Sequence, residues 1–201
     1  MPGRGSEEMK VGGIAQDAPN NPVAYLEAFQ IVFEENKALI YSLCYRMLSN
    51  RQEAENLAQE VFLNAFNAYP HFRGESKVST WLYHIAVNLI NKELKRKKLK
   101  RLLSLDFLSE ESGRTPTIEH VHPGHGPSAE FERKEMERIV RRLIGSLPKR
   151  QRTAITLQYY EGLSYEEIAS VMEISHSSVE SLLFRAKQSL ERRLSPYLTG
   201  A

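Results

Sequence analysis

The sequence has one cysteine in 201 residues, so it offers neither an internal disulfide nor a cysteine metal cluster. No apolar run approaches the roughly 18 residues that a membrane-spanning helix needs. The N-terminus also lacks the charged-then-apolar pattern of a secretory signal. No catalytic triad, paired carboxylates or phosphate-binding loop occurs at a suitable spacing. These absences predict a non-enzymatic protein of the reducing cytoplasm, without membrane insertion, metal or cofactor.

Charge of either sign is nearly balanced overall, with a net charge of +2, but it is unevenly distributed. Residues 20–101 carry twelve basic and eight acidic side chains, and residues 130–201 carry twelve and ten. Between them, residues 102–129 carry one basic and four acidic side chains. Because nucleic-acid binding depends on local basic patches more than on total charge, this pattern is compatible with a DNA-binding protein.

Apolar residues recur at helical spacing through two long blocks, and no alternating strand pattern competes with them. Residues 1–21 are rich in Gly, Pro and Asn and are predicted to be a disordered tail. Residues 22–101 form the first helical block and residues 130–201 the second. Residues 102–129 contain several Gly and Pro and are predicted to be a flexible acidic linker. We therefore expect an all-α protein of two small domains.

The second block contains the layout of a helix-turn-helix. Ser164 and Glu167 have the spacing of a capping box at the start of a short helix over residues 165–172. A short turn at residues 173–175 then leads into a longer helix over residues 177–194. In this motif the second helix enters the DNA major groove.

Helical periodicity places the apolar residues of that longer helix on one face and a mostly polar stripe on the other. Phe184 lies in the polar stripe, where an aromatic ring could contact thymine methyl groups. The alternative is that Phe184 packs against another helix. Candidate DNA-contacting residues on this helix are Ser177, Ser178, Glu180, Ser181, Phe184, Arg185 and Gln188.

A second candidate DNA-binding helix is predicted from Ser79 to about Arg101. Its first half carries an apolar side and a polar stripe suited to base edges and phosphates. Its second half, from Lys92 onward, is mostly Lys and Arg, which favours a polyanionic partner; a solvated basic helix end or a nuclear localisation signal is the alternative. The loop at residues 72–77 has the composition of one that could hold an unstacked base. The polar stripe is Thr80, His84, Asn88, Asn91 and Lys95.

Three stretches, residues 54–63, 79–88 and 147–187, occur together in an order and spacing that resemble the extracytoplasmic-function (ECF) group of sigma-70 factors. This resemblance implies a sigma-2 domain over residues 22–101 and a sigma-4 domain over residues 130–201. It implies a transcription initiation factor that binds core RNA polymerase, recognises the −35 and −10 promoter elements and promotes melting. Its expected partners are promoter DNA, the large-subunit coiled coil and flap of the polymerase, and an anti-sigma factor.

The resemblance also assigns roles to individual residues. Asn56, Gln59 and Glu60 match positions that dock on the polymerase coiled coil. The longer helix of the helix-turn-helix matches the reader of the −35 element. The residues matching the −10 region are Ser76, Lys77, Thr80, Trp81, His84, Asn88, Asn91 and Lys95.

Several positions depart from the common family pattern, among them Glu180, Ser181 and Leu182, which stand where basic residues are common. His84 stands where Arg is frequent, and Glu173 stands in the turn where Gly is frequent. If the backbone at Glu173 has a positive φ, that residue carries strain. These departures leave the exact promoter sequence open.

Other features support weaker alternatives. His120, His122 and His125 cluster in the linker, but a metal site would need them to converge, preferably with a fourth ligand. Cys44 lies in an apolar helix and is expected to be part of the core rather than a redox switch. The competing function is a stand-alone dimeric helix-turn-helix regulator, which would bind its operator without polymerase.

Overall fold

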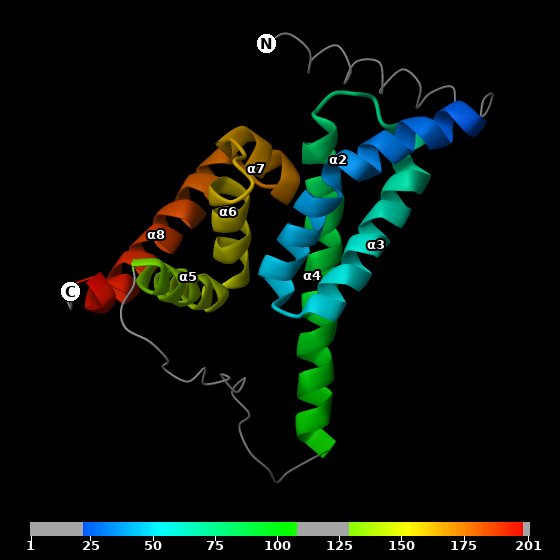
Figure 1. Ribbon diagram of the computed structural model, residues 1–201. Helices are drawn as coiled ribbons and strands as arrows, with labels where there is room; N and C mark the ends of the chain where they lie inside the picture. Colours follow the sequence, from blue (N-terminus) through cyan, green and yellow to red (C-terminus); the bar gives the residue numbers. More distant parts are fainter. Residues whose placement is uncertain (1–21, 108–128, 199–201) are drawn as a thin grey trace, which may run out of the picture.

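The computed structural model describes residues 22–107 and 129–198, and every regular element in them is helical (Figure 1). This confirms the expected all-α class. No helix in the described ranges is long and apolar enough to cross a membrane. The elements are α2 (Pro22–Leu48), α3 (Arg51–Ala68), the short 3-10 helix η1 (Tyr69–His71), α4 (Val78–Phe107), α5 (Ala129–Gly145), α6 (Lys149–Tyr159), α7 (Tyr165–Met172) and α8 (His176–Leu198).

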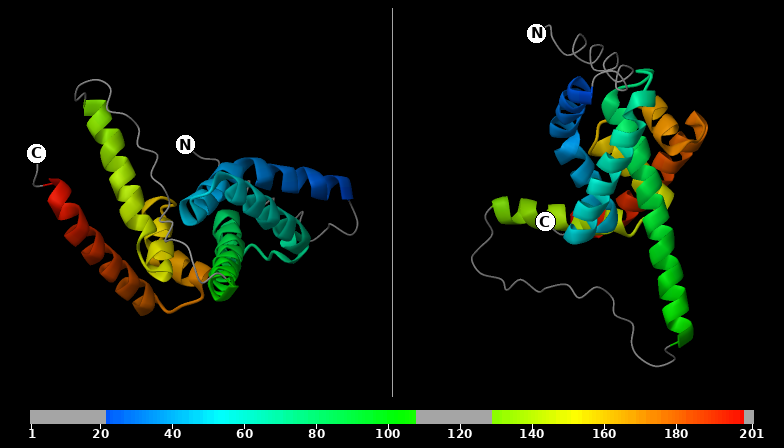
Figure 2. Two further views of the ribbon diagram at one scale, coloured as in Figure 1. Left: turned by 90° about the horizontal axis from the view of Figure 1, so that it is seen from below. Right: turned by 90° about the vertical axis from the view of Figure 1, so that its right-hand side faces the viewer.

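The first domain is a bundle in which α2, α3 and α4 pack on one another (Figures 1 and 2). Asn50 ends the turn between α2 and α3 and caps α3, because its side chain accepts a hydrogen bond from the Glu53 amide. The far end of α4 extends beyond the bundle in both views. The largest fully buried side chains of this domain are Val32, Ile40, Leu43, Met47, Val61, Tyr69, Leu82 and Ile90.

The second domain consists of α5 to α8. The predicted capping box is present: Ser164 Oγ accepts from the Glu167 amide at 3.2 Å, and the Glu167 carboxylate accepts from the Ser164 amide at 2.9 Å. Burying Ile168 and Val171 then fixes the short α7 against its neighbours α6 and α8. The core side chains include Leu157, Ile168, Val171, Val179 and Leu183.

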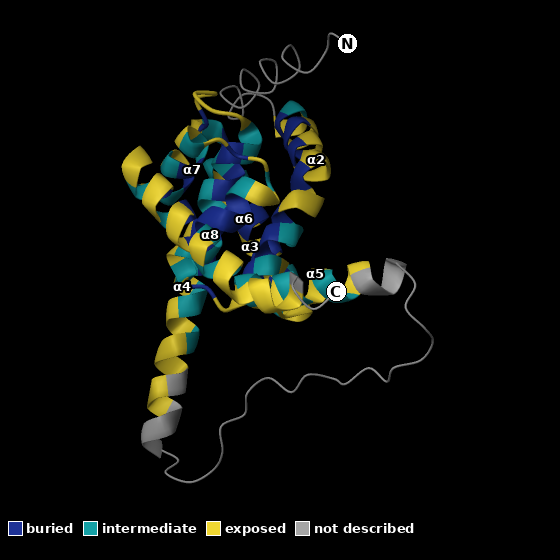
Figure 3. Cartoon of the chain, turned by 90° about the vertical axis from the view of Figure 1, so that its left-hand side faces the viewer, coloured by how far each residue is buried: buried dark blue, intermediate teal, exposed yellow. Residues whose placement is uncertain are grey.

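The two domains are in contact: α7 lies against α4, and α6 lies against α2 (Figure 1). Figure 3 shows the buried residues concentrated around α6 and the first domain, while much of the surface of α8 is exposed. The polar stripe of α4 thus begins at an interface between domains rather than in open solvent.

Two helices extend further than the sequence predicts. Helix α4 continues to Phe107, six residues beyond Arg101, because the intervening residues include no Gly or Pro that would end it. Helix α8 runs from His176 to Leu198 and includes Pro196 near its end. The predicted tail at residues 1–21 and the linker residues 108–128 lie outside the described part of the chain.

Candidate nucleic-acid and polymerase interfaces

The predicted polymerase-docking residues share one exposed face of α3. Asn56, Gln59 and Glu60 are all exposed and follow the three- and four-residue spacing of a helix surface. Gln52 Nε2 donates to Asn56 Oδ1 at 3.1 Å and so holds that amide in place. Leu63, one turn further on, is 65% exposed and continues this face. Sequence reasoning did not single out Leu63, although its position three residues after Glu60 was a usable signal.

Trp81 anchors the loop at residues 72–77 rather than pointing freely outward. Its ring centroid lies 4.9 Å from that of Phe72 and 6.2 Å from that of Tyr69. Tyr69 is buried, and burial raises the pKa of its hydroxyl to about 12. Gly74 supplies the positive φ of +72° that the loop needs. The aromatic base therefore holds the predicted base-binding loop in a defined conformation.

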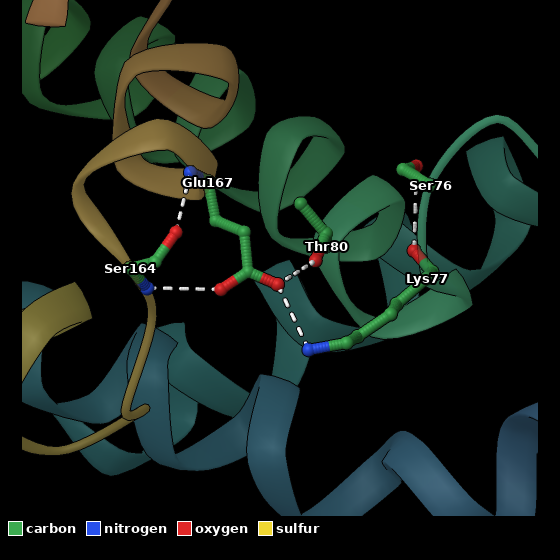
Figure 4. A network of polar contacts seen from close by, with 5 residues as sticks. All are labelled: Ser76, Lys77, Thr80, Ser164 and Glu167. Carbon is green, nitrogen blue, oxygen red and sulfur yellow. Dashed lines mark hydrogen bonds and ion pairs between the residues drawn. The ribbon is translucent and has the colours of Figure 1, made fainter.

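The start of α4 is occupied by a carboxylate from the second domain (Figure 4). Glu167 Oε1 lies 3.0 Å from Lys77 Nζ and 3.4 Å from Thr80 Oγ1, which donates to it. Thr80 is consequently only 6% exposed, although the sequence places it on an open polar stripe. Ser76 remains exposed beside them.

Further along α4, the polar stripe meets the turn of the helix-turn-helix. His84 Nε2 donates to Glu173 Oε1 at 2.8 Å, and the exposed Asn88 amide nitrogen lies 3.3 Å from the same ring nitrogen. The backbone oxygen of Asn91 accepts a hydrogen bond from Lys149 Nζ at 3.1 Å. Lys95 stays exposed. The structure thus places α7 and the turn after it over the first part of the polar stripe of α4, while Trp81 lies apart from that stripe in the aromatic base of the loop.

Glu173 meets the condition under which its place in the turn would carry strain. Its φ is 52° and its ψ 51°, in the left-handed region. A non-glycine residue there costs roughly 1–2 kcal/mol. Its backbone amide nevertheless bonds back to the carbonyls of Ala169 and Ser170, which ends α7.

The predicted −35 stripe of α8 is open. Phe184 is 66% exposed, so within the described residues its ring is not packed into a helix contact. The alternative interpretation of Phe184 is therefore wrong for this conformation. Ser178 is half-buried next to the turn, with its hydroxyl 2.8 Å from that of Ser175. The remaining stripe residues, all exposed, are Ser177, Glu180, Ser181, Arg185 and Gln188.

Glu180 on α8 lies close to a histidine one helical turn before it. One of its carboxylate oxygens lies 3.8 Å from His176 Nδ1, and the same imidazole lies 3.3 Å from Glu166 through Nε2. Lys187 on the same helix lies over the Tyr159 ring, with its Nζ 5.5 Å from the ring centroid. This leaves the Glu180 carboxylate exposed at the helix surface.

Two residue pairs at the domain interface had no signal in the sequence. The Tyr83 hydroxyl donates to Glu161 Oε2 at 2.8 Å, and burial raises the pKa of both groups, with the mutual hydrogen bond lowering that of Glu161. The Arg46 guanidinium lies 3.7 Å from the centroid of the Tyr160 ring, a cation–π arrangement. Periodicity finds the faces of single helices, but it cannot pair residues 78 positions apart.

The described residues contain no group of three or more His, Cys, Asp or Glu that could hold a metal ion. The cluster of His120, His122 and His125 lies outside the described part of the chain. Cys44 is fully buried, and burial raises the pKa of its thiol to about 12, which fits the expected core role.

Comparison with protein families matches residues 32–100 to Sigma-70 region 2 and residues 137–190 to Sigma-70, region 4. The RNA polymerase sigma-H factor of Pseudomonas aeruginosa is 35% identical over 87% of this chain and 90% of its own length. The ECF RNA polymerase sigma factor SigW of Bacillus subtilis is 34% identical over 84% of this chain and 89% of its own length. The ECF RNA polymerase sigma-E factor of Escherichia coli is 33% identical over 86% of this chain and 89% of its own length.

Fold and surfaces together define a two-domain helical protein with a helix-turn-helix in its second domain. The chain belongs to the sigma-70 family, in its extracytoplasmic-function group.

Two solved structures share the fold. The sigma factor RpoE in complex with the anti-sigma factor NepR from Bartonella quintana superposes with a TM-score of 0.63 at 22% identity, over 83% of this chain and 96% of that one. CnrH in complex with the cytosolic domain of CnrY superposes with a TM-score of 0.63 at 19% sequence identity, over 94% of this chain and 98% of that one.

Proposed function

We propose that this protein is a transcription initiation factor that binds core RNA polymerase, recognises the −35 and −10 promoter elements and promotes promoter melting. The observation that carries the proposal is the presence, in one chain and in family order, of both sigma-70 regions. The relatives named above support it, because all are RNA polymerase sigma factors and align over most of their length. The polymerase supplies the catalysis, and the chain supplies promoter recognition in the cytoplasm.

In the −35 role, α8 would lie in the major groove with its exposed stripe toward the bases. A helix surface fits that groove, and hydroxyl, amide, carboxylate and guanidinium groups can read its donor and acceptor pattern. Phe184 suits this role, because its 66% exposed ring is accessible for apolar contact with a thymine methyl group. Arg185 is placed to bind guanine or a phosphate.

In the −10 role, the polar stripe of α4 would contact the separated strands, and the loop at residues 72–77 would hold an unstacked base. The rigid aromatic base beneath the loop, formed by Phe72, Trp81 and Tyr69, supports this assignment. The exposed basic residues beyond Lys92 would follow the DNA backbone, where they release bound counterions.

The partners follow from the same surfaces. The exposed face of Asn56, Gln59 and Glu60 would dock on the large-subunit coiled coil of the polymerase, and the second domain on its flap. An anti-sigma factor is the expected inhibitor, in keeping with the structural neighbour RpoE, which was determined in complex with the anti-sigma factor NepR.

The test separates an initiation factor from a stand-alone regulator. Purified protein, core polymerase and the two together are each incubated with a library of genomic DNA fragments, and bound fragments are recovered and sequenced. An initiation factor enriches a shared two-part motif only in the presence of core polymerase. Enrichment of an operator by the protein alone would favour the regulator and contradict the proposal.

A further inference from the structure

His176, the first residue of α8, lies between two carboxylates that come from different helices. Its Nε2 atom is 3.3 Å from Glu166 Oε1 on α7, and its Nδ1 atom is 3.8 Å from Glu180 Oε1 on its own helix. The Tyr165 ring lies alongside, with its centroid 5.7 Å from that of the imidazole. Each ring nitrogen therefore faces one carboxylate, and the imidazole connects the start of α7 to the first turns of α8.

The stability of α8 alone does not account for a histidine at this place. The helix dipole disfavours a cation at a helix N-terminus, so a protonated His176 gains nothing from its own helix. The two carboxylates offset that cost. The pKa of Glu166 is lowered by hydrogen bonds to its own backbone amide and to the Ser164 hydroxyl, and further by His176. Glu166 therefore stays charged at neutral pH and holds one side of the imidazole.

Glu180, on the other side of the imidazole, belongs to the −35 stripe. An exposed carboxylate beside DNA is repelled by phosphates unless its charge is offset or it accepts a hydrogen bond from a base such as cytosine. Within residues 22–107 and 129–198, no Lys or Arg forms an ion pair with Glu180, and His176 is the basic side chain that does. The first turns of a recognition helix are the part that reaches base edges, so the orientation of this carboxylate matters for reading.

We propose that His176 is a positioning residue for −35 recognition: it orients the Glu180 carboxylate toward its base pair and offsets the charge of that carboxylate next to the DNA backbone. The proposal rests on the proposed function, because it needs α8 to be the reader of the −35 element. Glu166 in turn orients the imidazole through its other nitrogen. The base preference of α8 thus depends on a contact made within the protein.

The experiment selects promoters from a sequence library with core polymerase and the full chain, and sequencing gives the preference at each −35 base pair. The variants are H176A, E180A and the two together. H176A should reduce the preference at the base pair read by Glu180 about two- to fivefold, the effect of an exposed ion pair, and leave the other positions unchanged. In the E180A background, H176A should have no further effect, because the group that it positions is absent.

A conservative variant and a matched pair of controls test the geometry. Asparagine carries an amide donor close to the place of the imidazole Nδ1, so H176N should retain most of the preference that H176A loses. E166Q removes the charge on the far side of the imidazole and should relax the preference at the same base pair. E191Q removes the same charge from another exposed position, on α8, and should leave every preference unchanged.

An unchanged preference in H176A overturns the proposal. An equal effect of H176A in the E180A background also overturns it, because His176 would then act on DNA without Glu180. A uniform loss at all −35 positions, with no rescue by H176N, shows a general weakening of α8 and overturns it as well. So does an unaltered preference in E180A, which would leave no base reading for His176 to support.

The wild-type chain tests the proposed function in the same selection. If it enriches a two-part motif with core polymerase and the His176 variants depart from expectation, only the role of His176 is wrong. If the wild type enriches no motif with core polymerase, the proposed function fails, and the role of His176 fails with it.

Discussion

The hydroxyl of Tyr83 on α4 donates a 2.8 Å hydrogen bond to Oε2 of Glu161, which precedes the helix-turn-helix of the other domain. The bond joins two groups that are both withdrawn from solvent. The bond links the two domains directly, and a Tyr83→Phe substitution removes the donating hydroxyl without changing the rest of the ring.

Tyr83→Phe should destabilise the chain by about 1–3 kcal/mol at neutral pH, the cost of leaving a buried acceptor without its donor. Burial raises the pKa of Glu161 above 4.5, because the charged carboxylate is disfavoured in the folded state. The protonated Glu161 side chain therefore contributes fully to stability below pH 4.5, and this contribution is lost as the pH rises through the pKa of Glu161 in the folded protein. The hydrogen bond from Tyr83 lowers the pKa of Glu161, so the pKa of Glu161 should be higher in the Tyr83→Phe variant than in the wild type. Thermal unfolding at several pH values should show that the stability difference between the variant and the wild type increases from pH 4 to pH 7.

The control for this prediction is Tyr45→Phe, which removes a hydroxyl from a 37% exposed side chain of α2. It should leave stability nearly unchanged at every pH. A difference for Tyr83→Phe that is constant across the pH range would disconnect the hydrogen bond from the ionisation of Glu161.

Ser164→Ala removes the side-chain acceptor at the start of α7 and should cost about 0.5–2 kcal/mol. The Glu167 amide then loses its 3.2 Å partner, while the rest of the helix is unchanged. Ser170→Ala, at an exposed position of the same helix, is the control and should be neutral or slightly stabilising. Chemical denaturation measures both. Equal stability of the two variants would show that the capping box contributes nothing.

Glu173→Gly separates backbone strain from charge in the turn. Glycine adopts the left-handed conformation at φ 52° without the penalty that a side chain incurs, so the relief is worth about 1–2 kcal/mol. It also removes the partner of His84. Glu173→Asn removes the same charge with a residue that tolerates this conformation less well than glycine. Denaturation should therefore rank the glycine variant above the asparagine variant, and the reverse order would show that the turn is not strained.

Most of the fold could be predicted from the sequence, because apolar periodicity indicates a helix and capping residues indicate where it begins or ends. The capping box of Ser164 and Glu167 was predicted from local pattern and is present. The left-handed conformation of Glu173 was raised only as a condition, because glycine is frequent at that position in the family, and the structure has it. The burial of Thr80 was not, because it depends on Glu167, 87 residues away, and no local rule pairs them. The end of α4 was misplaced for a simpler reason: a change in composition after Arg101 suggested a linker, but helix propensity persists to Phe107.

Gln59→Ala with Glu60→Ala should weaken binding to core polymerase, because both side chains lie on the exposed face assigned to docking. The matched control is Glu27→Ala with Gln30→Ala, which removes the same two residue types from exposed positions of α2. Each hot-spot side chain of such an interface is worth about 1–2 kcal/mol or more, so the dissociation constant should rise at least about tenfold. Unchanged affinity, measured by fluorescence anisotropy, would refute the assignment of these residues.

Glu180→Ala and Arg185→Ala should differ in how they change recognition of the −35 element. A carboxylate that accepts from cytosine N4 specifies one base pair, so its loss should relax preference there and cost about 1–3 kcal/mol on the cognate sequence. A phosphate-binding Arg185 should weaken all promoters alike and reduce the salt dependence. Selection from a promoter library in the presence of polymerase distinguishes them. An unaltered preferred sequence with Glu180→Ala would leave reading to the serines, Phe184 and DNA shape.

The most direct measurement of the central claim is multi-round transcription in vitro, with purified core RNA polymerase, fragmented genomic DNA and this protein, followed by sequencing of the transcript 5′ ends. The account predicts transcripts that appear only when the protein is added and that start at a fixed distance downstream of a shared pair of elements, with permanganate-reactive thymines at the upstream edge of the start site. Transcription that is unchanged by the protein, or starts that share no such elements, would contradict it.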